Sequence, residues 1–314
     1  MARRQKGDLI HGWVNLDKPL GMTSTQAIGK IRSILKGSKA GHAGTLDPLA
    51  TGILPIALGE ATKTIPYIQD SIKTYEFIVT WGEQRDTDDM EGDIIATSDH
   101  RPSERAIQDI LPEFMGHIQQ TPPQFSAIKI AGQRAYDLAR AGEDVELKSR
   151  EVFIKSLKLI STDKDIASLE MTCGKGTYVR SLARDMAEKL GTKGYVSTLR
   201  RIKVGPFTTQ NTISLDILAN MDYIAARREA LLPVHTALDD IPALAVTAEE
   251  TARLRNGQEL EFITRQDFAR LEKAGLAGTK NKAALASYKD DIIAIIEVDK
   301  YKVSPVRVFN LEKK

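Results

Sequence analysis

Hydrophobic and polar side chains alternate along several segments of the chain, a pattern that predicts β-strands. In residues 73–81, every second side chain from Tyr75 to Trp81 is aromatic or aliphatic, so these side chains fall on one face of the expected strand. Residues 166–173 alternate in the same way. Three more strand-like segments lie near the end of the chain, at residues 284–288, 292–298 and 305–309.

Apolar residues spaced three and four positions apart predict helices between these strands. The clearest helix covers residues 178–190 and is ended by Gly191. Further helices are expected from Ser24, Ser103 and Thr247, because each has a hydroxyl side chain suited to the start of a helix. The chain therefore mixes helices and strands along its whole length.

Helices and strands do not alternate in a regular βαβ order, so the expected fold class is α+β. We expect a large domain over residues 1–235 and a small β-rich domain over residues 236–314. The acidic stretch at residues 82–93 is expected to be an exposed loop between strands.

The composition, with 42% hydrophobic and 27% charged residues among 314, is that of an ordinary globular protein. No apolar run reaches the roughly 18 residues of a membrane-spanning helix, and the basic N-terminus lacks the apolar core of a secretory signal. We therefore expect a cytoplasmic protein with no membrane partner. The single cysteine, Cys173, excludes an internal disulfide. The five histidines show no metal-ligand spacing, so no metal site is expected.

Charge is distributed unevenly, although the formal net charge is only +2. Residues 1–50 hold eight Lys or Arg against three Asp or Glu, and residues 171–205 hold eight against two. Residues 81–120 hold three against ten. The two basic segments would attract a polyanion if the fold joins them into one face, whereas scattered solvated lysines would give the same count.

The densest group of conformationally special residues is the segment at 41–55, with the sequence GHAGTLDPLATGILP. Its glycines permit tight turns, and Pro48 disfavours a helical conformation at Asp47. A lone aspartate in such a loop is most often a turn former or a helix cap. Asp47 becomes a catalytic candidate only through its wider sequence context.

That context is a set of motifs in one order. Residues 41–52 resemble the signature loop of the TruB family of tRNA pseudouridine synthases, which reads G-H-x-G-x-L-D-P-x-A-x-G. The other matching motifs are NLDKP at 15–19, GEATK at 59–63, KTY at 73–75, GTYVRSL at 176–182, TLRR at 198–201 and VGPF at 204–207. The resemblance covers about residues 10–235, and a weaker one extends into the C-terminal region.

The resemblance implies catalytic roles for three residues. Asp47 would be the nucleophile that attacks the target nucleotide, and Arg180 would bind its carboxylate and keep it ionised. A phosphate contact is the other reading of Arg180 as a helix residue. Tyr75 would stack on the uracil or move a proton, although its strand face also suits a residue of the sheet core.

Further roles implied by the resemblance concern substrate binding. His42 would help to replace the target base after it flips out of the RNA stack, and Tyr178 and Leu199 would line the uracil pocket. Lys18 and Pro19 would support the Asp47 loop. A solvated loop histidine is the alternative reading of His42.

The resemblance also implies the overall reaction and architecture. The fold would be a pseudouridine synthase fold, with a mixed, largely antiparallel central sheet flanked by helices and loops, followed by a small PUA-like domain. The substrate would be uridine-55 in the T-loop of tRNA, clasped by an insertion at residues 124–150. No cofactor would be needed, because the reaction is an isomerisation. We expect a monomer with no obligatory protein partner.

Two other functions remain open at this point. A non-catalytic RNA-binding or tRNA-chaperone protein would share the fold and the basic segments. A glycoside hydrolase would need a second carboxylate beside Asp47, and Asp17 is the nearest one in the motifs.

Overall fold

The computed structural model describes residues 10–37, 39–126, 129–130, 133–134, 136, 147–221, 224–289 and 291–311. Most of the expected RNA-clasping insertion at 124–150 lies outside these residues.

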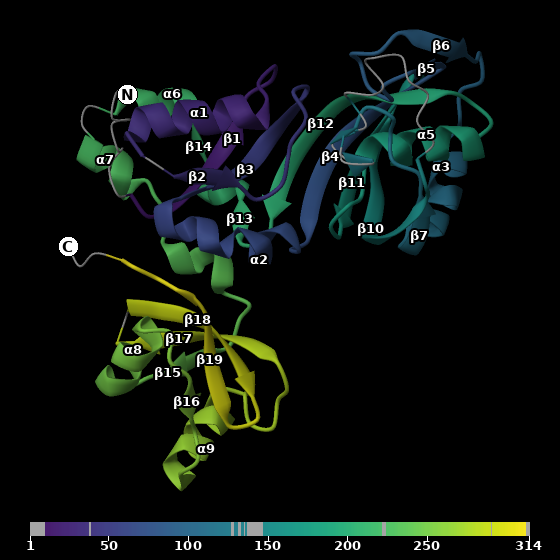
Figure 1. Ribbon diagram of the computed structural model, residues 1–314. Helices are drawn as coiled ribbons and strands as arrows, with labels where there is room; N and C mark the ends of the chain where they lie inside the picture. The colour runs from purple at the N-terminus through teal and green to yellow at the C-terminus, as the bar shows by residue number, and fades with distance from the viewer. Residues whose placement is uncertain are drawn as a thin grey trace.

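The larger part of the described chain is built on a ten-stranded sheet (Figure 1). Its strands are β1 (Gly12–Lys18), β2 (Ala40–His42), β3 (Ala50–Leu58), β4 (Lys73–Trp81), β7 (Gly116–Gln120), β10 (Arg150–Thr162), β11 (Ile166–Cys173), β12 (Gly194–Val204), β13 (Phe207–Thr208) and β14 (Ile213–Ser214). The main order is β14-β1-β3-β12-β4-β11-β10-β7, with β2 beside β3 and β13 beside β12. Only the β1–β14 and β3–β12 pairs are parallel among these strands, which confirms a mixed, largely antiparallel α+β sheet.

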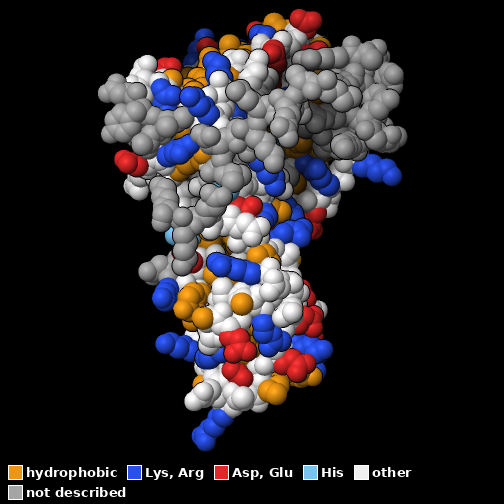
Figure 2. Space-filling model, turned by 60° about the vertical axis from the view of Figure 1, so that its left-hand side comes forward, with side chains coloured by type: hydrophobic (Ala, Val, Ile, Leu, Met, Phe, Trp, Pro, Cys, Tyr) orange, Lys and Arg blue, Asp and Glu red, His pale blue; other side chains and the backbone are white. Residues whose placement is uncertain are grey.

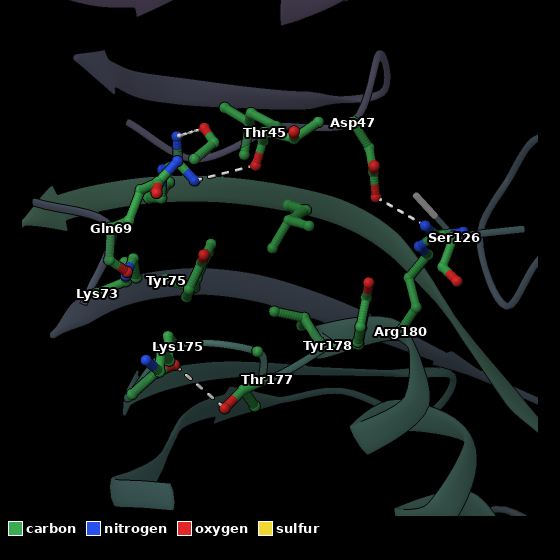
Figure 3. Close-up of a pocket in the computed structure, with 17 residues that line it drawn as sticks. Thr45, Asp47, Gln69, Lys73, Tyr75, Ser126, Lys175, Thr177, Tyr178 and Arg180 are labelled. Atoms are coloured by element: carbon green, nitrogen blue, oxygen red, sulfur yellow. Dashed lines mark hydrogen bonds and ion pairs between the residues drawn. The ribbon is translucent and has the colours of Figure 1, made fainter. Parts of the chain in front are cut away.

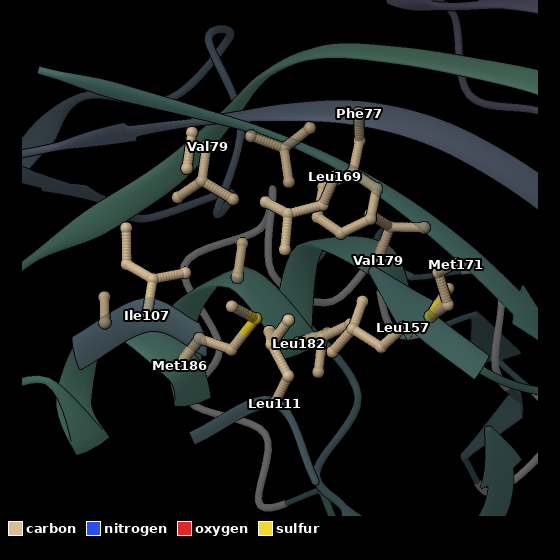
Figure 4. Packing of buried hydrophobic residues seen from close by; sticks show 14 of the residues in the cluster. Phe77, Val79, Ile107, Leu111, Leu157, Leu169, Met171, Val179, Leu182 and Met186 are labelled. Carbon is tan, nitrogen blue, oxygen red and sulfur yellow. The ribbon is translucent and has the colours of Figure 1, made fainter. Parts of the chain in front are cut away.

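Two hydrophobic cores lie against the two halves of this sheet. The flanking helical segments are α1 (Ser24–Leu35), η1 (Gly59–Thr64), α2 (Ile65–Gln69), α3 (Glu104–Ile110), η2 (Leu111–Phe114), α5 (Val179–Lys189), η3 (Thr209–Asn211), α6 (Leu215–Asn220), α7 (Ile224–Glu229) and η4 (Val234–Leu238). One core joins β4, β10 and β11 to α3 and α5 (Figure 4), and the other joins β1 and β3 to α1 and α6. Tyr75 and Leu199 contact both cores, so they mark the middle of the sheet.

A five-stranded sheet forms the C-terminal part of the described chain, with the order β15-β17-β18-β19-β16. Its elements are β15 (Ala243–Ala245), α8 (Ala248–Arg255), β16 (Leu260–Glu261), α9 (Arg265–Lys273), β17 (Lys282–Tyr288), β18 (Asp291–Asp299) and β19 (Lys302–Val308). The three expected strands near the chain end and the capping box of Thr247 are confirmed.

The two sheets are joined by a shared apolar cluster. Trp13 and Phe207 of the large sheet pack in the same cluster as Ile292, Ile295 and Phe309 of the small one. Polar contacts reinforce the junction: the Lys63 ammonium donates to the Val308 carbonyl at 2.7 Å, and the Glu60 carboxylate accepts from the Asn310 amide at 2.7 Å. In Figure 1 the small sheet, in yellow, lies below the half of the large sheet that carries β1 and β3.

Two local expectations are wrong. The cap of α1 is Thr23 rather than Ser24, because the Thr23 side chain accepts from the Gln26 amide in a capping box. The acidic stretch contains β5 (Glu83–Arg85), which pairs with β6 (Ile94–Thr97) directly after the stretch, and Asp88 and Asp89 within the stretch are only 4% and 8% exposed. They are buried because arginine side chains of α5 neutralise them.

Candidate active site

A cavity of about 270 Å³ opens at the middle of the large sheet (Figure 3). This volume is near the lower end of ordinary small-molecule pockets. The residues that line it come mainly from the loop before β3, from β4, from the turn before α5 and the start of α5, and from β12, and Gln69 of α2 and Ser126 add to them. They are Gly44, Thr45, Leu46, Asp47, Gln69, Lys73, Tyr75, Ser126, Gly174, Lys175, Gly176, Thr177, Tyr178, Val179, Arg180, Leu199 and Arg201.

Asp47 lies in the turn between β2 and β3, which the Ala50 amide closes by donating to the Asp47 carbonyl at 3.1 Å. We name residues 43–49 the Asp47 loop. The Asp47 side chain is 39% exposed, and its carboxylate lies 2.9 Å from the Arg180 guanidinium. A partly exposed carboxylate held by one arginine remains available to a ligand in the cavity.

Arg180 is buried at the start of α5, with its side chain 7% exposed. Its Nη2 contacts Asp47 and donates to the Phe125 carbonyl at 3.0 Å, and its Nη1 lies 3.3 Å from the Asp89 carboxylate and donates to the Thr87 carbonyl at 3.0 Å. The guanidinium therefore bridges two carboxylates. These bonds fix its plane and its distance from Asp47.

Lys18 and Ser24 fix the backbone of the Asp47 loop through hydrogen bonds to its main chain. The buried Lys18 ammonium donates to the Pro48 carbonyl at 3.3 Å and to the Met22 carbonyl at 2.7 Å. The Ser24 hydroxyl donates to the Leu46 carbonyl at 3.0 Å and accepts from the Leu46 amide at 2.9 Å. Burial lowers the pKa of Lys18 to about 8, against an opposing effect of the Asp47 charge.

Arg201 is a site residue to which the sequence assigned no individual role. It is 1% exposed on β12, and its guanidinium donates to the carbonyls of Ile53, Thr45 and Gly44 at 2.8, 3.2 and 3.2 Å. Two of these carbonyls belong to the Asp47 loop. Gly52 allows β3 and β12 to lie this close at Arg201. Its φ is +98°, and a Cβ there would lie 2.2 Å from the Arg201 carbonyl oxygen.

Three of the residues expected to bind the substrate lie together on the cavity wall. Tyr75 and Leu199, from neighbouring strands, are half-buried, and Tyr178 precedes α5. Gln120 fixes the Tyr178 backbone, accepting from its amide at 2.8 Å and donating to its carbonyl at 3.1 Å. Burial raises the pKa of Tyr75, so its hydroxyl stays protonated at neutral pH.

The other expected residues lie outside the described cavity wall. The half-buried His42 ends β2, and its Nδ1 accepts from the Gly44 amide at 3.3 Å. Burial and the Arg201 charge lower the pKa of His42, which favours the neutral ring. Pro19 is exposed, and its carbonyl accepts from the Lys18 ammonium at 3.0 Å.

Lys73 and Gln69 line the end of the cavity opposite Asp47 (Figure 3). The Lys73 ammonium donates to the carbonyls of Gln69 and Ser71, each at 2.6 Å. Burial lowers the pKa of Lys73 to about 8. Its place in a strand motif was visible in the sequence, but nothing there indicated that the side chain faces the cavity.

The basic segment at residues 171–205 is partly paired with acidic side chains. In residues 171–205, Arg180, Arg184 and Lys189 form ion pairs with carboxylates from the acidic segment 81–120. Two of these pairs neutralise positive charge within the fold, and the Lys189–Glu113 pair does so at the surface. Figure 2 accordingly shows Lys and Arg side chains on both parts of the molecule, with acidic side chains among them.

Asp17 does not join Asp47 as a second catalytic carboxylate. Arg200 binds it in a bidentate pair, with nitrogen–oxygen distances of 3.0 and 2.8 Å. Along β12, Arg200 alternates with Leu199 and Arg201, which line the cavity, so it points to the other face of the sheet. This placement argues against the glycoside hydrolase alternative.

Within the described ranges, no three His, Cys, Asp or Glu side chains gather closely enough to hold a metal ion. None of the helices in the described part of the chain is both long enough and apolar enough to cross a membrane.

Sequence comparisons connect this geometry to a family. Residues 32–179 match the model for the TruB family pseudouridylate synthase N-terminal domain, and residues 180–239 match that for the tRNA pseudouridylate synthase B C-terminal domain. The tRNA pseudouridine synthase B of Caulobacter vibrioides is 50% identical, covering 99% of this chain and 100% of its own length. That of Bradyrhizobium diazoefficiens is 51% identical, with coverages of 99% and 91%.

Solved structures share the fold. The match to an H/ACA RNP bound to a substrate RNA containing 2′-deoxyuridine has a TM-score of 0.73 at 22% identity, covering 96% of this chain and 85% of that one. A chain of a Cbf5-Nop10-Gar1 complex matches with a TM-score of 0.71 at 26% identity, with coverages of 95% and 84%. From the family models and the near full-length relatives, this chain belongs to the TruB family of pseudouridylate synthases.

Proposed function

We propose that this protein converts uridine-55 in the T-loop of tRNA to pseudouridine, with Asp47 as the nucleophile. The supporting observation is the Asp47–Arg180 pair at 2.9 Å, in which the carboxylate is 39% exposed at the wall of a cavity. The relatives of about 50% identity carry the name tRNA pseudouridine synthase B, which supports tRNA as the substrate.

In the proposed reaction, an Asp47 oxygen attacks C1′ of the target nucleotide as the N1–C1′ bond breaks. The detached uracil turns, and its C5 then bonds to C1′ while the aspartyl ester is released. The hydrogen on C5 leaves as a proton, and N1 of the uracil, whose bond to C1′ has broken, takes up a proton. Atoms and oxidation states balance without a cofactor, so the protein has to supply an ionised nucleophile, a pocket and a proton path.

The surrounding residues would divide the remaining work. Arg180 orients the Asp47 carboxylate through their ion pair. Tyr75, Tyr178 and Leu199 enclose the uracil while it turns, and the protonated Tyr75 hydroxyl is a candidate for the proton transfer. The neutral His42 ring would take the place that the flipped base leaves in the RNA stack.

The rest of the chain would hold the RNA. We propose that residues 236–314 bind tRNA as a PUA-like domain and that residues 124–150 clasp the T-arm. We further propose that the chain acts in the cytoplasm as a monomer with no obligatory partner. A sedimentation experiment at working concentration with and without tRNA tests whether the chain is a monomer, and a complex of two copies of the chain would contradict it.

The first test uses a T-arm transcript carrying tritium at C5 of its uridines. Pseudouridine formation releases that hydrogen to water, so the released tritium counts turnovers. We expect release with wild-type protein and none when uridine-55 is replaced by cytidine. Tight binding of the RNA without release would instead favour the non-catalytic RNA-binding function.

A further inference from the structure

Ser126 lines the cavity, and the proposed mechanism leaves its buried hydroxyl without a role. The residue is 3% exposed, and its Oγ has no hydrogen-bond partner among the residues that the structure describes. Buried hydroxyl groups are normally bonded, because losing water without a replacement partner costs free energy. A polar atom in this state on a cavity wall is suited to bind a polar group of the ligand.

The backbone on both sides fixes where this hydroxyl lies. The Ser126 amide donates to the Gln124 carbonyl at 3.0 Å, and the Ser126 carbonyl accepts from the Tyr136 amide at 3.0 Å. The preceding carbonyl, of Phe125, accepts from Arg180. Ser126 is therefore tied through the neighbouring peptide to the arginine that holds the nucleophile.

Figure 3 shows Ser126 beside Asp47 and Arg180, at the opposite end of the cavity from Lys73 and Gln69. If Asp47 acts at C1′, as the proposed function requires, this end of the cavity receives the ribose. The 2′-hydroxyl is on the carbon bonded to C1′, so it is the ribose hydroxyl nearest to the reaction. The uracil would extend from C1′ towards Tyr75 and Tyr178.

We propose that the Ser126 hydroxyl binds the ribose 2′-hydroxyl of the target nucleotide and so selects RNA over DNA at that position. Both groups donate and accept hydrogen bonds, and the 2′-hydroxyl is the group by which a protein distinguishes the two nucleic acids. The inference rests on the proposed function for the placement of the ribose. It assigns Ser126 to substrate binding and selection.

The chain offers a matched control in Ser181. Its hydroxyl is also fully buried and also lacks a partner among the described residues, but Ser181 is absent from the described lining of the cavity. Ser126→Ala and Ser181→Ala thus make the same chemical change, inside and outside the proposed contact.

The test is a double-substitution cycle on binding, made in the Asp47→Asn background so that the RNA is not converted. T-arm RNAs carry either uridine or 2′-deoxyuridine at the target position. We expect Ser126→Ala to weaken binding of the uridine RNA about three- to tenfold, the range of one hydrogen bond. Replacing the target uridine by 2′-deoxyuridine should weaken RNA binding by a similar factor in the protein that keeps Ser126. In the Ser126→Ala protein, the same replacement should weaken RNA binding little further.

Two results would overturn the proposal. In the first, the losses of affinity from Ser126→Ala and from 2′-deoxyuridine multiply when the two changes are combined. In the second, 2′-deoxyuridine does not weaken binding to the protein that keeps Ser126. The second result is measured with the Asp47→Asn protein alone, so misfolding of Ser126→Ala cannot hide it. Ser126→Thr, which keeps the hydroxyl, and Ser181→Ala should both retain the preference for uridine. Tritium release by wild-type protein is measured separately, so failure of the proposed function is recognised independently of the cycle.

Discussion

Two loops meet at Arg180, and different kinds of contact dominate in holding them. The Asp47 loop is bound through its backbone, because Lys18 and Arg201 donate to its carbonyls. The acidic loop at residues 86–93 is bound mainly through its side chains, because Asp88 and Asp89 pair with arginines of α5, although Arg180 also donates to its Thr87 carbonyl. Each loop brings one charged partner to its side of the site.

The difference shows what each loop positions. Cations bound to carbonyls hold the main chain and leave the Asp47 carboxylate free to face the cavity. Carboxylates bound to guanidinium groups hold side chains, so the acidic loop fixes Arg180 and Arg184. Substitutions in the first set should disturb the nucleophile, and those in the second should disturb its partner.

The largest effect is expected from Asp47→Asn, which removes the nucleophile and leaves the carbonyl contacts in place. Tritium release should fall by about 10⁴-fold or more, as when a nucleophile is removed from other enzymes, while T-arm binding changes only a few-fold. Single-turnover release and fluorescence anisotropy measure the two quantities. Persistent product would show that the nucleophile is misassigned.

Arg201→Met should loosen the Asp47 loop, because the buried Ile53 carbonyl and the part-buried Thr45 and Gly44 carbonyls lose their donor. A shift of about 1 Å at a reacting group costs roughly a hundredfold in rate, and we expect the free energy of unfolding to fall by about 3 kcal/mol. The control is Arg200→Met, which breaks a partly exposed ion pair on the other face of the sheet and should cost less than about 1 kcal/mol. Equal losses in both variants would remove the special role of Arg201.

Asp88 gives the acidic loop a pH dependence. Burial raises its pKa to about 6 from the ordinary 3.8, in spite of Arg184 and Arg180 nearby. Between these values the folded protein binds more protons at this group than the unfolded chain, so its stabilising contribution is lost as pH rises from about 4 to 6. Relative to wild type, Asp88→Asn should gain at most about 3 kcal/mol across that window. Parallel pH profiles from urea unfolding would contradict this.

Asp89→Asn tests whether the second carboxylate positions Arg180. The Arg180–Asp47 contact would remain, but the guanidinium would lose its charged support on the other side. We expect a fall in kcat of about tenfold with KM nearly unchanged, the size of one charge-assisted bond. Asp93→Asn, at an exposed position of the same loop, is the control. A change confined to KM would indicate a role in binding.

The sequence predicted the strands, several caps and the motif loop because these depend on local patterns. Arg201 could not be assigned a separate role, because in a basic strand segment it cannot be distinguished from Arg200 until the strand order places one of them beneath the Asp47 loop. Asp88 and Asp89 were assigned to an exposed loop for a related reason. Their burial depends on α5 lying opposite them, a long-range contact that charge counting does not reveal.

Ser24 illustrates the same limit at close range. A hydroxyl at the start of a helix is expected to be the cap, but Thr23 takes that role and leaves the Ser24 hydroxyl to bind Leu46. The cavity residues Lys73 and Ser126 were likewise unassigned, since which side of a strand or loop faces a pocket is decided by the assembled fold.

The apolar cluster that joins the two sheets also ties their folding together. Trp13 and Phe207 on one side and Ile295 and Phe309 on the other are each at most 2% exposed. A chain cut before β15 would present the first pair to water, where exposed aromatic surface favours aggregation. The two parts should therefore melt in one cooperative transition, because the small sheet covers apolar side chains of the large one.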